Sequence, residues 1–128
     1  MFKKLLAIAI IFCCSHSFSQ SPELKFSKEF DQCLDKANST SASVTCTYDE
    51  VNRQDLRLNQ NYRVVMKNLT TVRQQSLTKA QKLWVQFRDA NCAFYLDPDG
   101  GTMARQLAAM CVLTMTRDRA DEIAQMDH

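Results

Sequence analysis

Residues 47–74 read TYDEVNRQDLRLNQNYRVVMKNLTTVRQ, and they predict one long amphipathic helix. Apolar side chains recur at steps of three, four or seven residues, at Tyr48, Val51, Leu58, Tyr62, Val65, Leu69 and Val72. Asp55 occupies the one position that this spacing skips. Thr47 and Glu50 fit the S/T-x-x-E capping box, which favours a helix that begins near Thr47. Such a helix is about 40 Å long, and it indicates a helical fold.

Helical spacing also appears on both sides of this segment. We expect further helices over about 24–37, 78–95 and 102–126, and no run of alternating residues is long enough to predict a strand. The expected helices at 78–95 and 102–126 have apolar stripes that we expect in the core: Ala80, Trp84, Phe87 and Phe94, then Met103, Leu107, Met110, Cys111, Met115 and Ile123. Small polar residues at 38–43 and the turn-forming sequence at 97–101 separate the helices. The expected fold class is all-α, a small up-and-down bundle of about four helices.

The first nineteen residues have the three-part layout of a secretory signal peptide. Lys3 and Lys4 precede ten apolar residues at 5–14, and small Ser17 and Ser19 precede a cleavage site before Gln20. The apolar segment is too short to remain as a membrane-spanning helix. We therefore expect a signal peptide at 1–19, a single domain at 20–128, and a periplasmic or secreted bacterial protein. Lipidation at Cys13 or Cys14 is the disfavoured alternative, because bulky Phe12 directly precedes Cys13, and Ile11 and Phe12 make a poor lipidation motif ahead of Cys14.

Loss of the signal peptide changes the charge of the chain. All 128 residues together carry a formal net charge of +2, from 16 basic and 14 acidic residues. Without Lys3 and Lys4 the 16 basic residues fall to 14, which makes the domain neutral. A neutral domain lacks the basic surface typical of nucleic-acid or anionic-membrane binding, so we expect a protein partner and no nucleic acid. We also expect no integral membrane segment once the signal is removed.

Four cysteines remain after residue 20: Cys33, Cys46, Cys92 and Cys111. An even number of cysteines in an exported chain predicts two disulfide bonds. Two antiparallel helical hairpins would bring Cys33 level with Cys46 and Cys92 level with Cys111, so this pairing is preferred among the three possible. A zinc site is the alternative, and the short C-x2-C spacing that structural zinc sites favour is absent.

No group of residues in the sequence predicts catalysis. Asp97, Asp99 and Gly100 resemble a fragment of a calcium loop, but without the bidentate Glu of an EF-hand an ordinary turn is favoured. The acidic residues near 118–122 lie among arginines and fit a solvated helix face. His128 is the one histidine left after the signal, so no base is available to activate a serine. We expect no enzyme activity, no metal and no cofactor.

Polar and aromatic residues also lie on or beside the expected apolar stripes, at Asn59, Tyr62, Gln81, Trp84 and Arg88. Two interpretations remain open for them. They form either a buried hydrogen-bond network that fixes the helix register, or a binding patch.

Several motifs together resemble one known family. They are L-N-x-x-Y at 58–62, A-Q-x-x-W-x-x-F-R-D-x-x-C at 80–92, and Gly100-Gly101 followed by Cys111, Thr116, Arg119 and Ala120. With Cys33 and Cys46 they follow the order of the LprI-type lysozyme inhibitor family of bacterial exported proteins, over about residues 30–124. The resemblance implies a helical, disulfide-bonded, exported protein in which Asn59, Tyr62, Gln81, Trp84, Arg88, Thr116 and Arg119 are structural. Lysozyme inhibition is attributed to the namesake, a lipoprotein, and the poor lipidation motif here departs from it.

This resemblance and the lack of catalytic groups predict a non-enzymatic protein that inhibits lysozyme-like muramidases by occluding their cleft. Lysozyme clefts depend on two carboxylates, so the contact should offer hydroxyl, amide or arginine donors. We expect the contact at two loops, 38–43 and 97–102, with the residues Asn38, Ser39, Thr40, Ser41, Asp97, Asp99, Gly100 and Gly101. The alternative is an envelope accessory protein that uses an exposed helix face to bind a partner other than lysozyme.

Overall fold

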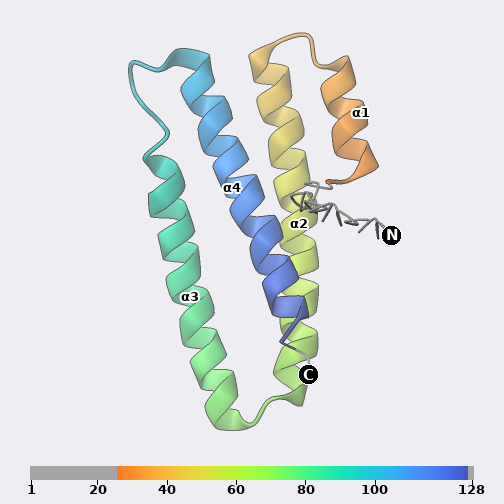
Figure 1. Cartoon of the computed structure of the whole chain (residues 1–128), viewed down its shortest axis with the longest axis vertical. Coiled ribbons are helices and arrows are strands. Elements are labelled where there is room, and N and C mark those ends of the chain that lie inside the picture. Colours follow the sequence, from red (N-terminus) through yellow and green to blue (C-terminus); the bar gives the residue numbers. More distant parts are fainter. Residues whose placement is uncertain (1–25, 127–128) are drawn as a thin grey trace, which may run out of the picture.

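The computed structural model describes residues 26–126, which form four helices and no strand. The helices are α1 (Lys28–Lys36), α2 (Thr40–Asn68), α3 (Thr71–Ala93) and α4 (Gly101–Ala124). Consecutive helices run in opposite directions, so α2 and α4 run the same way and lie side by side (Figure 1). The prediction of an all-α up-and-down bundle is confirmed. The signal peptide expected at 1–19 and the cysteines at 13 and 14 lie outside the described residues.

The α2–α4 pair forms the main body of the bundle. Leu58 and Val65 of α2 are buried with Ala120 and Ile123 of α4, and Ala120 lets the two backbones come close because its side chain is small. By contrast, α1 packs mainly on α2, and α3 packs mainly on α4. Each of these outer helices therefore leaves much of its surface to solvent.

α1 is attached to α2 through the buried carboxylate of Glu50. Ser27, the residue that caps α1, donates both its backbone N–H and its hydroxyl to Glu50. The Ser27 hydroxyl oxygen in turn accepts the backbone N–H of Phe30. The S/T-x-x-E pattern therefore gave a wrong helix start, because the partner of Glu50 is a residue of another helix and not Thr47.

α2 begins at Thr40, seven residues before the predicted start, and most of the expected loop 38–43 is its first turn. Ser39 caps this turn by accepting the N–H of Ala42. The hydroxyls of Ser43, Thr45 and Thr47 each donate to the carbonyl four residues earlier, so these polar side chains are satisfied within the helix. Polar residues that are typical of a loop are therefore accommodated inside a helix that begins at the Ser39 cap.

The predicted helix 47–74 is divided at Leu69 and Thr70, and α3 begins at Thr71 instead of 78. Neither glycine nor proline marks this break. Gln74 holds the turn, because its side-chain amide donates to the carbonyls of Met66 and Leu69 at the end of α2. Val72, expected in the core, follows the break and is 72% exposed.

Four residues of the expected core stripes of the last two helices are also exposed: Phe87, Phe94, Met103 and Leu107. α3 contributes Leu77 and Cys92 to the buried core, and the side of α3 that carries Phe87 has no helix packed on it. In α4 the buried positions are instead Ala104, Ala108, Leu113 and others of the face toward α2. The apolar residues do recur at helical spacing, but some of them lie on the surface of the bundle and not in its core.

Candidate functional site

The two loops predicted to contact a partner lie at the same end of the bundle (Figure 1). One joins α1 to α2 around Asn38 and Ser39, and the other joins α3 to α4 at 97–100. Between the starts of α2 and α4 is a small pocket of about 200 Å³, lined by Thr40, Ser41, Val44, Thr102 and Arg105. The fold thus brings together residues that are about 60 positions apart in the sequence.

Arg105 is a residue of this pocket that the sequence did not single out. Its side chain is exposed and forms no ion pair or hydrogen bond with another residue of 26–126. Ser41 and Thr102 place hydroxyl groups beside it. A free guanidinium next to hydroxyls is a group of donors that can bind a carboxylate.

Large apolar side chains flank the second loop. We call Phe94, Tyr95, Leu96, Met103 and Leu107 the loop-end apolar residues. All five are exposed, and Phe94 is 84% exposed while its ring packs edge-on against Tyr95. Exposed aromatic and methionine side chains concentrated in this way are typical of protein–protein contact sites.

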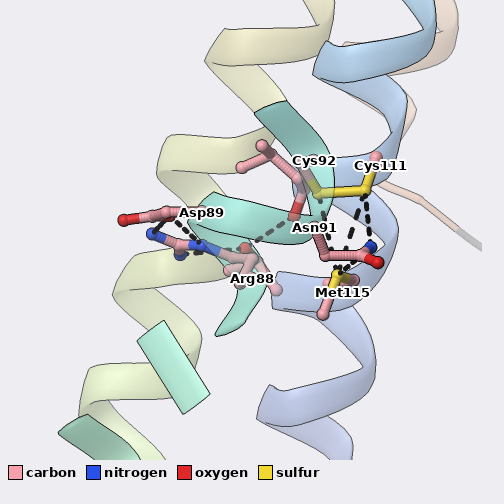
Figure 2. The surroundings of a disulfide bond; sticks show 8 residues. Arg88, Asp89, Asn91, Cys92, Cys111 and Met115 are labelled. Carbon is pink, nitrogen blue, oxygen red and sulfur yellow. Dashed lines mark hydrogen bonds and ion pairs between the residues drawn. A yellow bond between two sulfur atoms is a disulfide. The ribbon is translucent and has the colours of Figure 1, made fainter. Parts of the chain in front are cut away.

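Two disulfide bonds fix this end, and both predicted pairings are confirmed. Cys33–Cys46 joins α1 to α2, and Cys92–Cys111 joins α3 to α4, with Cα–Cα distances of 5.7 and 5.5 Å. Figure 2 shows the second bridge with Asn91 and Met115 beside it. The Asn91 amide donates to the sulfur atoms of Cys111 and Met115, each 3.5 Å away. Each bridge lies close to a loop, so the loop ends are held by covalent bonds.

The α3–α4 loop is a tight turn that its own side chains stabilise. The Asp97 carboxylate accepts the N–H of Asp99 at 2.9 Å, and the N–H of Gly100 bonds to the Asp97 carbonyl. Gly101 has φ +59°, and a Cβ on Gly100 would lie 2.7 Å from that of Ala104. Both glycines are therefore required by the turn itself. Asp97 is engaged in the turn, whereas the carboxylate of Asp99 is exposed.

A second group of predicted residues joins α3 to α4. Two guanidinium groups lie near the Trp84 ring, with Arg88 5.1 Å and Arg119 5.8 Å from its centre. Arg119 also donates to Gln81 at 3.0 Å, and Arg88 donates to the Thr116 hydroxyl at 3.3 Å. These contacts make one connected set across the two helices, and stacking on an aromatic ring adds to the packing.

Two further motif residues lie on α2. Tyr62 forms a hydrogen bond of 3.0 Å with Thr78, which links α2 to α3. Asn59 is exposed, and its amide donates to the backbone and side-chain oxygens of Asp55 on the same helix. Asn59 is therefore separate from the set around Trp84.

Glu50 is an important residue whose role the sequence did not reveal. Burial alone raises the pKa of this carboxyl, but hydrogen bonds from Ser27, Arg53 and Gln54 outweigh burial and hold the pKa below its usual value. Arg53 and Gln54 donate at 2.7 Å each. Arg53 and Gln54 could have been predicted as partners, because they follow Glu50 by three and four residues on the same helix. No sequence pattern identifies Ser27 as the third partner.

Four helices, two disulfides and an exposed apolar end define a small stapled helical domain with a surface suited to a protein partner. The chain belongs to the LprI family, since the family model described as "Lysozyme inhibitor LprI" matches residues 33–123. An uncharacterised protein of Rhizobium meliloti (strain 1021) is similar to it, with 23% identity over 135 residues, 94% of this chain and 91% of the relative. No solved structure matches the chain.

Family membership and the disulfides fit an exported protein with a protein partner such as lysozyme. They are also consistent with an inhibitor that is not an enzyme. None of the helices within 26–126 combines the length and the hydropathy needed to cross a bilayer.

Proposed function

We propose that the protein is an exported lysozyme inhibitor and that its disulfide-stapled loop end occludes the muramidase cleft. The observation that carries the activity is the match of residues 33–123 to the lysozyme inhibitor family. Its non-enzymatic character and its place in the periplasm or outside the cell are part of the same proposal.

The loop end is the favoured contact because it combines three properties that an inhibitor needs. The loop-end apolar residues supply surface that gains free energy when water is removed from it. Arg105 and the neighbouring hydroxyls supply donors for the carboxylates of a muramidase cleft. The two disulfides hold the contact in shape, which lowers the entropy lost on binding.

A cell-wall lysis assay tests the activity. Purified mature protein at micromolar concentration should slow the clearing of a bacterial cell-wall suspension by at least one animal or bacterial lysozyme. Undiminished lysis by all lysozymes tested would refute the proposed function. Capture of a stoichiometric envelope protein without muramidase activity would instead favour the accessory-protein alternative.

Two leucines allow a matched test of the location. Leu107 lies in the loop-end group and is 50% exposed, whereas Leu56 is 60% exposed on α2 away from the loops. Leu107→Ala should weaken inhibition about tenfold, which corresponds to about 1.4 kcal/mol for a central apolar contact. Leu56→Ala should leave inhibition unchanged. Equal effects of the two substitutions would place the contact elsewhere.

A further inference from the structure

A groove along α3, remote from the loop end, has a different chemical character. It is open, has a volume of about 610 Å³, and is lined by Met66 of α2 and by the α3 face between Thr71 and Gln86. Its polar lining contains Lys79, Lys82, Gln75 and Gln86, and Leu83 adds an apolar part. Within residues 26–126 these four polar side chains form no hydrogen bond or ion pair, so they are available to a ligand.

The groove lies in a segment of the chain whose charged residues are all basic. Residues 56–88 contain seven basic residues and no acidic one, although the domain as a whole is neutral. Arg57 and Arg88 are paired with Asp121 and Asp89. The other five are exposed and have no acidic partner within 26–126: Arg63, Lys67, Arg73, Lys79 and Lys82. The net charge of zero therefore conceals a strongly basic α2–α3 hairpin, which attracts anions.

We propose that this groove binds an extended acidic peptide segment of a partner. Glutamine amides both donate and accept, which matches the N–H and C=O groups of a peptide backbone. Lysines offer point charges that suit single carboxylates, and no arginine, whose planar fork favours bidentate contact with carboxylate or phosphate, lines the groove. Single-stranded nucleic acid binds on aromatic platforms, and none lines the groove.

The dimensions of the groove define the ligand further. From Thr71 to Gln86 the helix rises by about 22 Å, which an extended peptide covers with about seven residues. Lys79 and Lys82 are three positions apart on the helix, so their Cβ atoms are about 5–6 Å apart. Side chains two positions apart on an extended strand are about 6.6 Å apart. The expected ligand thus has acidic residues at alternate positions.

Fluorescence anisotropy with labelled octapeptides tests this proposal on the mature protein. A peptide of alternating Glu and Ala should bind saturably, and the corresponding peptide of Gln and Ala should not. A peptide of the same composition with Glu at positions 1, 2, 5 and 6 should bind several-fold more weakly, because no two of its Glu residues are two positions apart. Equal binding of all three peptides would overturn the proposal.

Paired charge reversals provide the matched control. Lys79→Glu/Lys82→Glu should weaken binding of the alternating peptide at least tenfold. Lys28→Glu/Lys36→Glu changes the net charge by the same amount on exposed α1, and binding should stay within twofold. Similar losses in both double variants would show non-specific attraction and would refute a groove site. Circular dichroism of each variant checks that the helices are retained.

Two competitors separate the peptide from other anions. Tighter binding of an oligothymidine strand or of phosphatidylglycerol vesicles than of the alternating peptide would refute the peptide assignment. The Lys79→Glu/Lys82→Glu protein should still inhibit lysozyme like the unmodified protein, because the groove and the loop end are separate. In the unmodified protein, a lack of peptide binding with retained lysozyme inhibition would refute the groove site alone, and peptide binding without lysozyme inhibition would refute the proposed function alone.

Discussion

Replacing Glu50 with glutamine removes the charge that joins α1 to α2 while it keeps the shape of the side chain. One oxygen of the buried carboxylate accepts from the Ser27 hydroxyl and Arg53, and the other accepts from the Ser27 N–H and Gln54. A glutamine retains one acceptor oxygen and turns an NH2 group toward the other pair of donors. Two charge-assisted hydrogen bonds are therefore lost.

The expected cost follows from this count. A hydrogen bond to a charged group contributes about 1.5–3 kcal/mol. The Arg53 side chain is 38% exposed and can bond to water after the substitution. A donor at the buried end of the site has no such replacement, so its lost hydrogen bond carries most of the cost. We therefore expect the free energy of unfolding to fall by about 2–3 kcal/mol. Urea titration followed by circular dichroism measures it, with the slope of the transition unchanged.

Acid titration gives a second, independent readout of Glu50. Its pKa is lower in the folded protein than the ordinary value of 4.5, because the hydrogen bonds from Ser27, Arg53 and Gln54 favour the charged form. The carboxylate thus contributes its full stability above about pH 4.5 and loses it as the pH falls through the folded pKa. The difference in stability between the unmodified protein and Glu50→Gln should accordingly shrink below pH 4.5.

Asp49 provides the control, since it is exposed and its carboxylate forms no hydrogen bond within 26–126. Asp49→Asn removes the same charge one position away, and we expect a change of less than about 0.5 kcal/mol. If Glu50→Gln were no more destabilising than Asp49→Asn, the role of the buried carboxylate would be refuted. A difference between Glu50→Gln and the unmodified protein that stays constant from pH 7 to pH 3 would contradict the pKa argument.

Three other variants test the scaffold by urea titration and hydrogen exchange. Cys92→Ala/Cys111→Ala opens a link of sequence separation 19 and should cost about 3 kcal/mol in the chain-entropy model, and free thiols in the non-reduced protein would contradict the bridge. Leu113→Ala, at a fully buried position, should cost about 3 kcal/mol, and a loss below 1 kcal/mol would contradict the α2–α4 core. Gln74→Ala removes two bonds to the end of α2 and should cost about 2 kcal/mol, with faster amide exchange at the start of α3; unchanged exchange there would show that another contact holds the turn.

The sequence was most informative where local pattern and tertiary contact agree. Leu58, Tyr62 and Val65 follow the helical period, and the structure places all three on the buried or half-buried side of α2. The disulfide pairing followed from the expectation of two helical hairpins, each with one cysteine on either arm. Both inferences depend on spacing alone, and spacing survives errors of several residues in the helix ends.

The helix ends themselves depend on side-chain bonds that spacing does not encode. Ser39 begins α2 within a stretch typical of a loop, and Gln74 ends the preceding helix without any glycine or proline. Ser27, the partner of Glu50 from outside α2, is 23 residues away at the start of another helix, so no local motif identifies it. The candidate contact residues were predicted as loops, although Thr40 and Ser41 lie in the first turn of α2, and Arg105 was not predicted because it lies inside an expected helix.

The apolar stripe of α3 shows why periodicity does not distinguish core from binding surface. Leu77 and Phe87 satisfy the same helical pattern, yet Leu77 is buried and Phe87 is exposed. The difference arises because α3 packs on α4 with one side and has no helix on the other. An uncovered apolar side carries a cost in water unless a partner covers it. Exposed side chains such as Phe87 and Phe94 contribute little to the core, and their exposure supports the proposal that α3 and its loop bind another protein.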